Sequence, residues 1–271
     1  MNHLSLFLLI ILIVNFRSSA NVTSKEQLFY DAVRLESAGD IVNAIKNYEN
    51  ALSQASSANL HGNLANLYYL NGDYGRSILH YRKALLLEPN NRDFRYNLAY
   101  VNGIAKVAPP NIDSSIALIE LSGDFWKSLL AIFFWSGLLI ICFLYFRRFK
   151  NKFITMTSAC WILGNILLFY VIYNSTRQTN ILERTVVAVS PFNVLENNSS
   201  AVIQLRKFAA KTSSSNSSVR VGESLIVEKK ETGGLQSHES QDAQTWLLVS
   251  TLDKRRKGWV LEEEIGWLSR N

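Results

Sequence analysis

The chain has 271 residues, of which 48% are hydrophobic, and its formal net charge is +6 at pH 7. This length leaves room for two small domains beside a membrane-spanning part. Residues 21–110 carry nine basic and eight acidic side chains, and residues 174–271 carry thirteen and eleven, so both outer parts are nearly neutral. The positive excess lies around the hydrophobic middle of the chain instead, and a nucleic-acid partner is therefore not expected.

The N-terminus has the composition of an export signal. An apolar run from Leu4 to Val14 is followed by the small residues Ser18, Ser19 and Ala20. This order predicts a signal peptide over residues 1–20, with cleavage after Ala20; an uncleaved signal anchor is the alternative. In both cases the domain that follows is exported.

Residues 24–106 contain a pattern that repeats after 33 residues. The pair Gly39-Asp40 recurs as Gly72-Asp73. The positions that follow also correspond: Ala44, Tyr48, Ala51 and Leu52 with Ser77, Tyr81, Ala84 and Leu85. Apolar residues spaced three and four apart predict amphipathic helices on either side of each turn. The pattern resembles the tetratricopeptide repeat and predicts an all-α domain. A third helix, from Arg92 to Lys106, would cover the second repeat.

The resemblance to tetratricopeptide repeats implies a concave face that binds peptides. The lining residues it implies here are Phe29, Val33, Asn63, Asn66, Tyr69, Leu70 and Asn97. The amides of Asn63 and Asn97 could bond the backbone of an extended peptide, whereas basic residues that would clamp a C-terminal carboxylate are missing. Alternatively, these side chains are ordinary packing or exposed residues. Because two and a half repeats are few for independent stability, a protein partner or a second copy of the chain would help.

The middle of the chain predicts a membrane hairpin. After a linker over residues 107–125, two uncharged runs give transmembrane helices over 126–146 and 154–173, each long enough to cross a lipid bilayer. The turn between them, residues 147–153, holds four positive charges. The positive-inside rule places this turn in the cytoplasm and both flanking domains on the other side of the membrane.

The period changes to two in residues 180–271, which indicates an all-β domain. Its expected strands are 185–189, 202–205, 224–227 and 246–250. The order Arg206, Gly222-Glu223, Trp246 and Gly258-Trp259-Val260 resembles bacterial SH3-like barrels, although the loops 207–219 and 229–244 are longer than usual. Trp246 and Trp259 could line a ligand groove. The alternative is that these tryptophans form the barrel core.

No motif for phosphate, metal or nucleophilic chemistry occurs in the chain. The histidines after His3 are scattered, although His61 and His80 could approach one another within the second repeat. We therefore expect neither a cofactor nor a metal, and a binding protein rather than an enzyme. A periplasmic enzyme is the third and least favoured alternative.

The whole order of segments resembles the BatE family of the bacterial Bat aerotolerance operon. The likeness rests on the segment 63–69, the turn 72–75, the positions around His80 and Asn97, and the final strand 258–260. It implies a two-pass inner-membrane protein with both soluble domains in the periplasm. Its partners would be von Willebrand-type Bat membrane proteins and an AAA+ ATPase system.

The sequence thus predicts a membrane-anchored scaffold whose repeats hold partner proteins. Confinement to the membrane plane raises effective concentrations, so that weak contacts suffice. The alternative is a cell-wall sensor in which the SH3-like domain binds peptidoglycan peptides.

Overall fold

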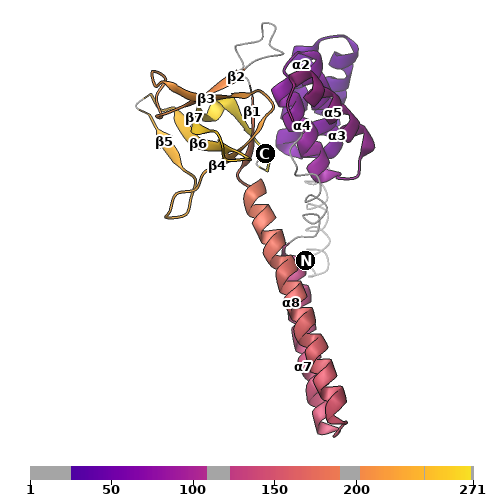
Figure 1. The fold of residues 1–271 in the computed structure, drawn as a ribbon. Coiled ribbons are helices and arrows are strands. Elements are labelled where there is room, and N and C mark those ends of the chain that lie inside the picture. The colour runs from indigo at the N-terminus through magenta and orange to yellow at the C-terminus, as the bar shows by residue number, and fades with distance from the viewer. Residues whose placement is uncertain (1–25, 109–122, 190–201, 241, 270–271) are drawn as a thin grey trace, which may run out of the picture. The chain divides into compact units, whose positions relative to one another are not determined.

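The computed structural model describes residues 26–108, 123–189, 202–240 and 242–269 (Figure 1). They divide into two compact units, one within Met1–Pro110 and Arg184–Asn271, the other within Asn111–Glu183. The first unit holds the helical repeats and a β-sheet, and the second holds a helical hairpin. The predicted signal peptide lies outside the described residues.

The repeat region is built from antiparallel helix pairs. Residues 26–37 form the first helix, and four further helices follow: α2 (Ile41–Gln54), α3 (Ala58–Leu70), α4 (Tyr74–Leu87) and α5 (Arg92–Ala105). Gly39 and Gly72 both adopt φ +79°, which lets the chain reverse between paired helices. Asp40 and Asp73 follow them and cap α2 and α4. Each carboxylate accepts a hydrogen bond from the backbone N–H of the third residue of its helix. The 33-residue period therefore marks the turns of the fold.

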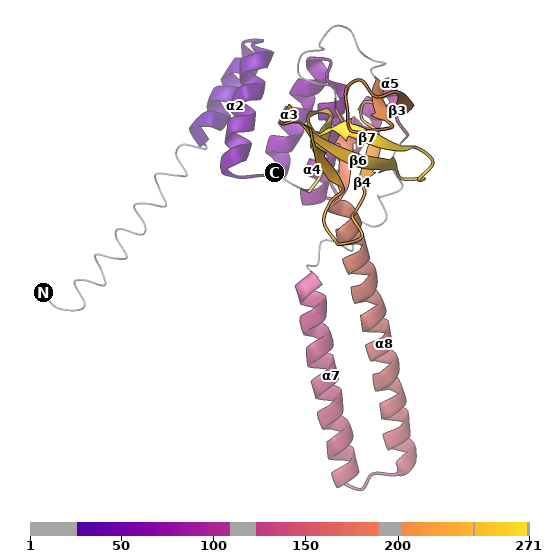
Figure 2. The same ribbon diagram turned by 90° about the vertical axis from the view of Figure 1, so that its left-hand side faces the viewer.

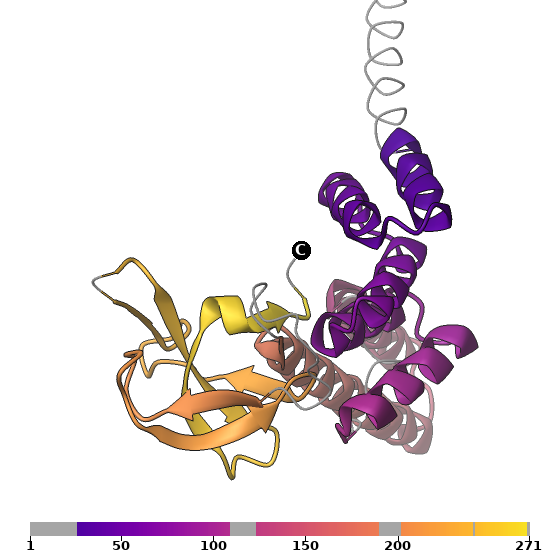
Figure 3. The same cartoon turned by 90° about the horizontal axis from the view of Figure 1, so that it is seen from above.

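The core of the repeats matches the predicted apolar positions. Small and large apolar residues of neighbouring helices form one core cluster, and the helices that contribute to it lie next to one another when seen from above (Figure 3). The fully buried members include Ala44, Tyr48, Ala51, Leu64 and Leu67. The predicted third helix is α5, which covers the second repeat through Leu98 and Val101.

The C-terminal region forms one antiparallel sheet of eight strands. The strands are β1 (Thr185–Ala188), β2 (Val202–Arg206), β3 (Ser215–Arg220), β4 (Ser224–Val227), β5 (Ser237–Glu239), β6 (Thr245–Thr251), β7 (Lys257–Leu261) and β8 (Ile265–Trp267). Their order is β3-β2-β7-β6-β4-β1-β8, with β5 paired to β6. Apolar side chains from one face of the sheet form the core.

The sheet is not closed, so the SH3-like barrel that the resemblance implies is not confirmed. The strands β3 and β8 end the strand order and do not pair with each other. Side chains occupy these two edges instead. Arg256 donates to the Ser218 carbonyl of β3 at 2.7 Å, and Leu79 of α4 packs at Gly266 of β8.

Two strands lie in segments that the sequence analysis treated as loops. The strand β3 begins within the predicted loop 207–219 and ends one residue after it, and β5 lies within the predicted loop 229–244. Both are rich in serine and charged residues, whose low β-propensity hides the strands. Pairing with β2 and β6 supplies the hydrogen bonds that local propensity does not predict.

Within the first unit, one side of α4 packs against the sheet. A Cβ placed on Gly75 would lie 2.4 Å from Val221 and 3.0 Å from the Ala188 carbonyl oxygen. The buried Arg82 donates to the Ser224 hydroxyl at 2.5 Å. Arg220 donates to the Lys106 carbonyl at 2.6 Å at the end of α5. The second helix of the second repeat is thus partly covered by residues that follow the hairpin in the sequence.

The hairpin consists of α7 (Gly123–Phe146) and α8 (Asn151–Leu182), which run side by side (Figure 2). Both helices are long and apolar enough to cross a membrane. Gly137 fits against Trp161 and Gly164 against Phe133, which allows the two helices to pack closely. The helix bounds differ from the predicted spans: α7 begins within the expected linker, α8 begins within the expected turn, and α8 continues nine residues past Tyr173.

Candidate protein-binding site

The first helices of the repeats carry a row of aromatic, aliphatic and amide side chains that are exposed or half-buried. We call this surface the tyrosine-asparagine face and define it by Asn66, Tyr69, Leu70, Tyr96, Asn97 and Tyr100. These residues come from α3 and α5. Leu70 is 62% exposed, Tyr96 is 74% exposed and Tyr100 is 54% exposed. Large side chains exposed together in this way are typical of interaction surfaces.

Ring contacts hold the tyrosines of this face together. The ring of Tyr69 lies 5.8 Å from that of Tyr100 in an edge-to-face arrangement and 6.1 Å from that of Tyr74. A hydrogen bond with Tyr100 raises the pKa of Tyr69. Because these contacts restrict the rings, the surface is ordered before any partner binds, which lowers the entropy cost of binding.

Buried tyrosine hydroxyls from the second helices position the amides. Tyr81 of α4 donates to the Asn66 carbonyl oxygen and also hydrogen-bonds Asn97. The equivalent Tyr48 of α2 donates to Glu36 at 3.2 Å and accepts from Asn63 at 3.4 Å. Burial raises the pKa of both tyrosines to about 12. Each hydroxyl thus links two neighbouring first helices and fixes the amides between them.

The residues predicted from the repeat pattern have different environments. Phe29 packs on Tyr48 with ring centroids 5.8 Å apart and belongs to the edge of the core, whereas Val33 is 37% exposed. Asn63 is half-buried, and Asn97 is half-buried with its hydrogen bond to Tyr81. The amides of Asn63 and Asn97 are therefore partly engaged within the chain, although each retains further donor and acceptor capacity.

Sequence reasoning missed Tyr96 and Tyr100, which provide much of the exposed aromatic surface. The sequence did contain a signal for them. Tyr96 and Tyr100 are four residues apart, which places both on one side of α5, next to Asn97. That helix was interpreted as a cover for the second repeat. In the structure its other side is exposed.

A pair of histidines lies between α3 and α4, with His61 buried and His80 half-buried. The Nδ1 atoms of His61 and His80 lie 2.9 Å apart, and the ring of His80 stacks on Tyr68 at 5.5 Å. Ser56 lies 3.0 Å from Nε2 of His61. Burial lowers the pKa of His61 to about 4 and that of His80 well below its ordinary value. Both rings are therefore neutral near pH 7.

A hollow of about 330 Å³ lies between α2 and the α3–α4 turn. Three of its charged groups are bonded within the chain: Glu49 accepts from Tyr68 at 2.5 Å, and Arg76 pairs with Asp73. The hollow therefore has fewer free bonding groups than the tyrosine-asparagine face.

The sheet offers less surface for a ligand than its tryptophans suggested. Trp246 is 1% exposed and belongs to the interior, where the Arg206 guanidinium lies 5.9 Å from its ring. Trp259 is half-buried and contacts His238 with ring centroids 6.4 Å apart. Within the described residues, no group of three or more histidine, cysteine or acidic side chains is arranged to hold a metal ion.

Comparison with known proteins identifies one part of the chain. Residues 58–91 match the tetratricopeptide repeat family. This segment covers α3 and α4, which contain the turn at Gly72 and the histidine pair. Repeats of this type serve protein–protein interaction. None of the curated protein sequences matches the chain.

Proposed function

We propose that this protein is a membrane-anchored scaffold whose tyrosine-asparagine face binds an extended segment of a partner protein. The observation that carries the proposal is the row of exposed side chains on α3 and α5, held by Tyr81 from behind. The sheet packs on α4 and leaves this row exposed. A surface kept open and ordered in this way fits a binding role.

The chemistry of the face points to an uncharged segment. None of its six residues is ionised near pH 7, and its largest members are tyrosines. Tyrosine rings can stack on apolar or proline side chains, and amides can bond a peptide backbone. A partner recognised by a charged terminus would need basic residues that this face does not have.

The arrangement in the membrane is part of the proposal. The hairpin would cross the bilayer twice, with the basic turn in the cytoplasm and both soluble regions in the periplasm. The contact between Arg82 and Ser224 supports this topology, since residues before and after the hairpin can meet only in one compartment. The even number of crossings that it requires agrees with the two apolar helices.

We further propose a role in a Bat-type envelope complex, with von Willebrand-type membrane proteins and an AAA+ ATPase system as partners. The support is the order of segments, in which repeats precede a hairpin and a small β domain. We interpret that domain as an SH3-like fold that is open at one seam. Its successive hairpins and the strand Gly258-Trp259-Val260 favour this interpretation.

A photocrosslinking experiment tests the binding face. A photoreactive amino acid replaces Leu70 in the full chain, and the matched control replaces Leu87, which is 50% exposed on α4. We expect one crosslinked partner from position 70, absent from position 87 and lost when Tyr100→Ala is added. Mass spectrometry then identifies the partner.

Equal capture from both positions, or capture that survives Tyr100→Ala, would contradict the proposal. Sedimentation with purified cell walls tests the alternative sensor role. The burial of Trp246 gives that alternative less support, because only one of its two tryptophans is accessible.

A further inference from the structure

The hairpin contains one amide in an otherwise apolar setting. Asn165 lies in α8, within the uncharged run from Ile154 to Tyr173. It is eleven residues from the start of that run and eight from its end. In a bilayer this places the amide near the middle of the hydrocarbon layer, where a polar side chain is costly unless it is bonded.

The bonding capacity of Asn165 is only partly used. Its Nδ2 donates to the Trp161 carbonyl oxygen one turn earlier at 2.8 Å. Among the described residues, nothing donates to its Oδ1, and its second Nδ2 hydrogen has no acceptor. In hydrocarbon these groups gain from a partner on another helix.

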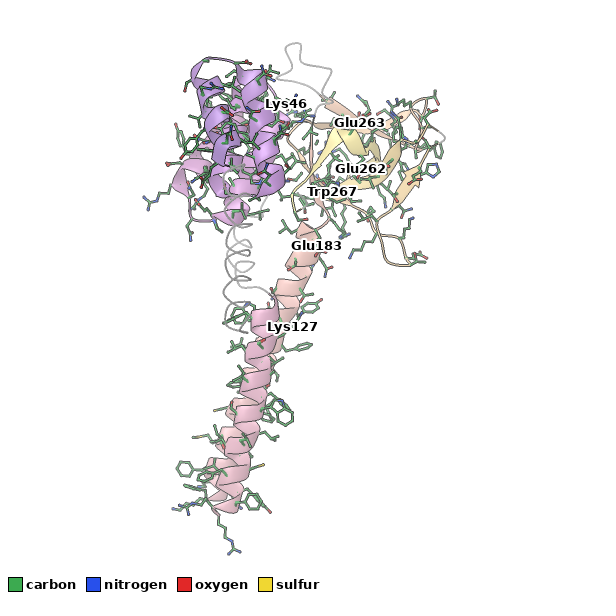
Figure 4. The ribbon with its side chains drawn as sticks, turned by 180° about the vertical axis from the view of Figure 1, so that it is seen from behind. Lys46, Lys127, Glu183, Glu262, Glu263 and Trp267 are labelled. Atoms are coloured by element: carbon green, nitrogen blue, oxygen red, sulfur yellow. The ribbon has the colours of Figure 1, made fainter. Side chains whose placement is uncertain are left out.

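Asn165 opens onto a groove of about 500 Å³ along the side of the hairpin. The groove is formed by Lys127, Ala131 and Phe134 of α7 with Asn165, Ile166 and Phe169 of α8. Figure 4 labels Lys127, which lies at the end of the hairpin away from the connecting turn. Apart from Lys127 and Asn165, the lining is apolar.

This groove borders the surface that joins α7 to α8, because Phe134 lines the groove and its ring lies 5.2 Å from that of Trp161. Gly137 and Gly164 form that internal surface by accepting the rings of Trp161 and Phe133. The groove residues Ile166 and Phe169 remain largely exposed beside this packing. The groove is therefore available to a further helix.

We propose that the groove is a self-association surface, in which Asn165 pairs with Asn165 of a second copy. Copies inserted in one orientation are related by a two-fold axis along the membrane normal, so identical residues meet at equal depth. An amide is self-complementary, since it both donates and accepts. A different partner helix would have to carry its own polar group at that depth. The inference rests on the proposed membrane insertion of the hairpin.

Cysteine crosslinking in membranes tests this arrangement in the full chain. The native Cys142 and Cys160 are both exposed and are first replaced by alanine. Single cysteines are then placed by Ile166→Cys, in the groove, and by Leu167→Cys, on the side of α8 turned away from Asn165 and Phe169. Both side chains are similarly exposed, at 60% and 64%, which makes them a matched pair.

We expect a disulfide-linked species of twice the chain mass from position 166 and not from position 167. Adding Asn165→Leu to Ile166→Cys should weaken association by about 3- to 30-fold, the effect of an interhelical hydrogen bond in a membrane. Ser158→Ala is the control, because that hydroxyl already bonds Ile154 within its own helix.

Three outcomes would overturn the inference. They are no crosslink at position 166, equal crosslinking at both positions that ignores Asn165→Leu, and a crosslinked species whose mass shows a different chain. Resistance of the protein to carbonate extraction is measured in parallel. Loss of that resistance in the parent chain would contradict membrane insertion itself, whereas a monomer that stays inserted contradicts only the self-association.

Discussion

The Nδ1 atoms of His61 and His80 face each other at 2.9 Å inside the second repeat. At this distance one Nδ1–H donates a hydrogen bond and the other Nδ1 accepts it, so at least one of the two rings must be neutral. The charged groups around the pair are Lys83 and Arg76 on α4, and both disfavour an additional proton. Glu49 of α2 is bonded to Tyr68, on which His80 stacks. The hydrogen bond therefore links α3 to α4 only while one of the two Nδ1 atoms remains unprotonated.

Acid should destabilise the repeats through this pair. A histidine has a pKa near 6.5 when unfolded, and that of His61 is about 4 in the fold, so the unfolded chain binds more protons between these values. The contribution of neutral His61 to the free energy of unfolding is therefore complete above pH 6.5 and is lost as the pH falls toward 4. His61 alone can contribute up to about 3 kcal/mol. Thermal unfolding of the full chain in detergent, followed by circular dichroism across this range, measures the effect.

The double variant His61→Gln, His80→Gln is the control for that measurement. Carboxylates also titrate in acid, and their contribution should persist in this variant. An unchanged loss of stability between pH 6.5 and 4 would show that the histidines are not responsible.

Tyr81→Phe should disturb the tyrosine-asparagine face from behind. The change removes a buried hydroxyl that bonds Asn66 and Asn97, and we expect a loss of about 1–2 kcal/mol in the free energy of unfolding. Capture of a partner from position 70 should fall as well, because the amides lose their fixed orientation. Tyr96→Phe is the matched control: its ring is largely exposed, and its effect should stay within about 0.5 kcal/mol.

Two glycine-to-alanine changes in helices should have opposite signs. The methyl group added by Gly103→Ala on α5 would have no atom within 4 Å. This change should therefore stabilise the fold by about 0.5–1 kcal/mol, because alanine has the higher helix propensity. Gly75→Ala on α4 would place a methyl group against Val221 and the Ala188 carbonyl, and should destabilise by about 1–3 kcal/mol. Urea unfolding measures both. A stabilising Gly75→Ala would mean that α4 and the sheet are not in contact.

Asp73 should be the more important of the two helix caps. It is buried, it accepts from the Arg76 N–H at 3.0 Å, and it pairs with the Arg76 side chain, whereas Asp40 is more exposed. We expect Asp40→Ala to cost about 1 kcal/mol and Asp73→Ala about 2 kcal/mol. Asp73→Asn keeps the cap and removes the ion pair, so its loss should be intermediate. Equal losses for the two alanine variants would show that burial of the ion pair adds nothing.

Local patterns in the sequence were sufficient for much of the fold. The recurrence of Gly39-Asp40 as Gly72-Asp73 located the turns, because reversal of the chain needs a left-handed residue followed by a cap. The two uncharged runs located the hairpin. A long helix that is apolar on all sides is typical of a membrane span, so its position can be recognised from the sequence alone. Strands β1, β2, β4 and β6 were found within one residue at each end, since each is a short run rich in apolar and β-branched residues.

The candidate site was only partly predictable from the sequence. The repeat resemblance placed Asn66, Tyr69 and Leu70 on one face, but it could not show that Tyr96 and Tyr100 extend that face. Whether a tyrosine on the last helix is buried or exposed depends on what packs there. The same uncertainty affected Trp246, whose spacing was equally suited to a groove and to a core.

Contacts between distant segments were decided only by the tertiary structure. The packing of α4 on the sheet joins Arg82 to Ser224, 142 positions later, and no local pattern encodes such a pair. The meeting of His61 with His80 was foreseen only as a possibility, because helix pairing sets which faces meet but not the ring geometry. By itself, the sequence determined the helices, the turns and the apolar spans, since these depend on neighbouring residues. The tertiary structure decided which surfaces remain open, because exposure depends on every segment that packs nearby.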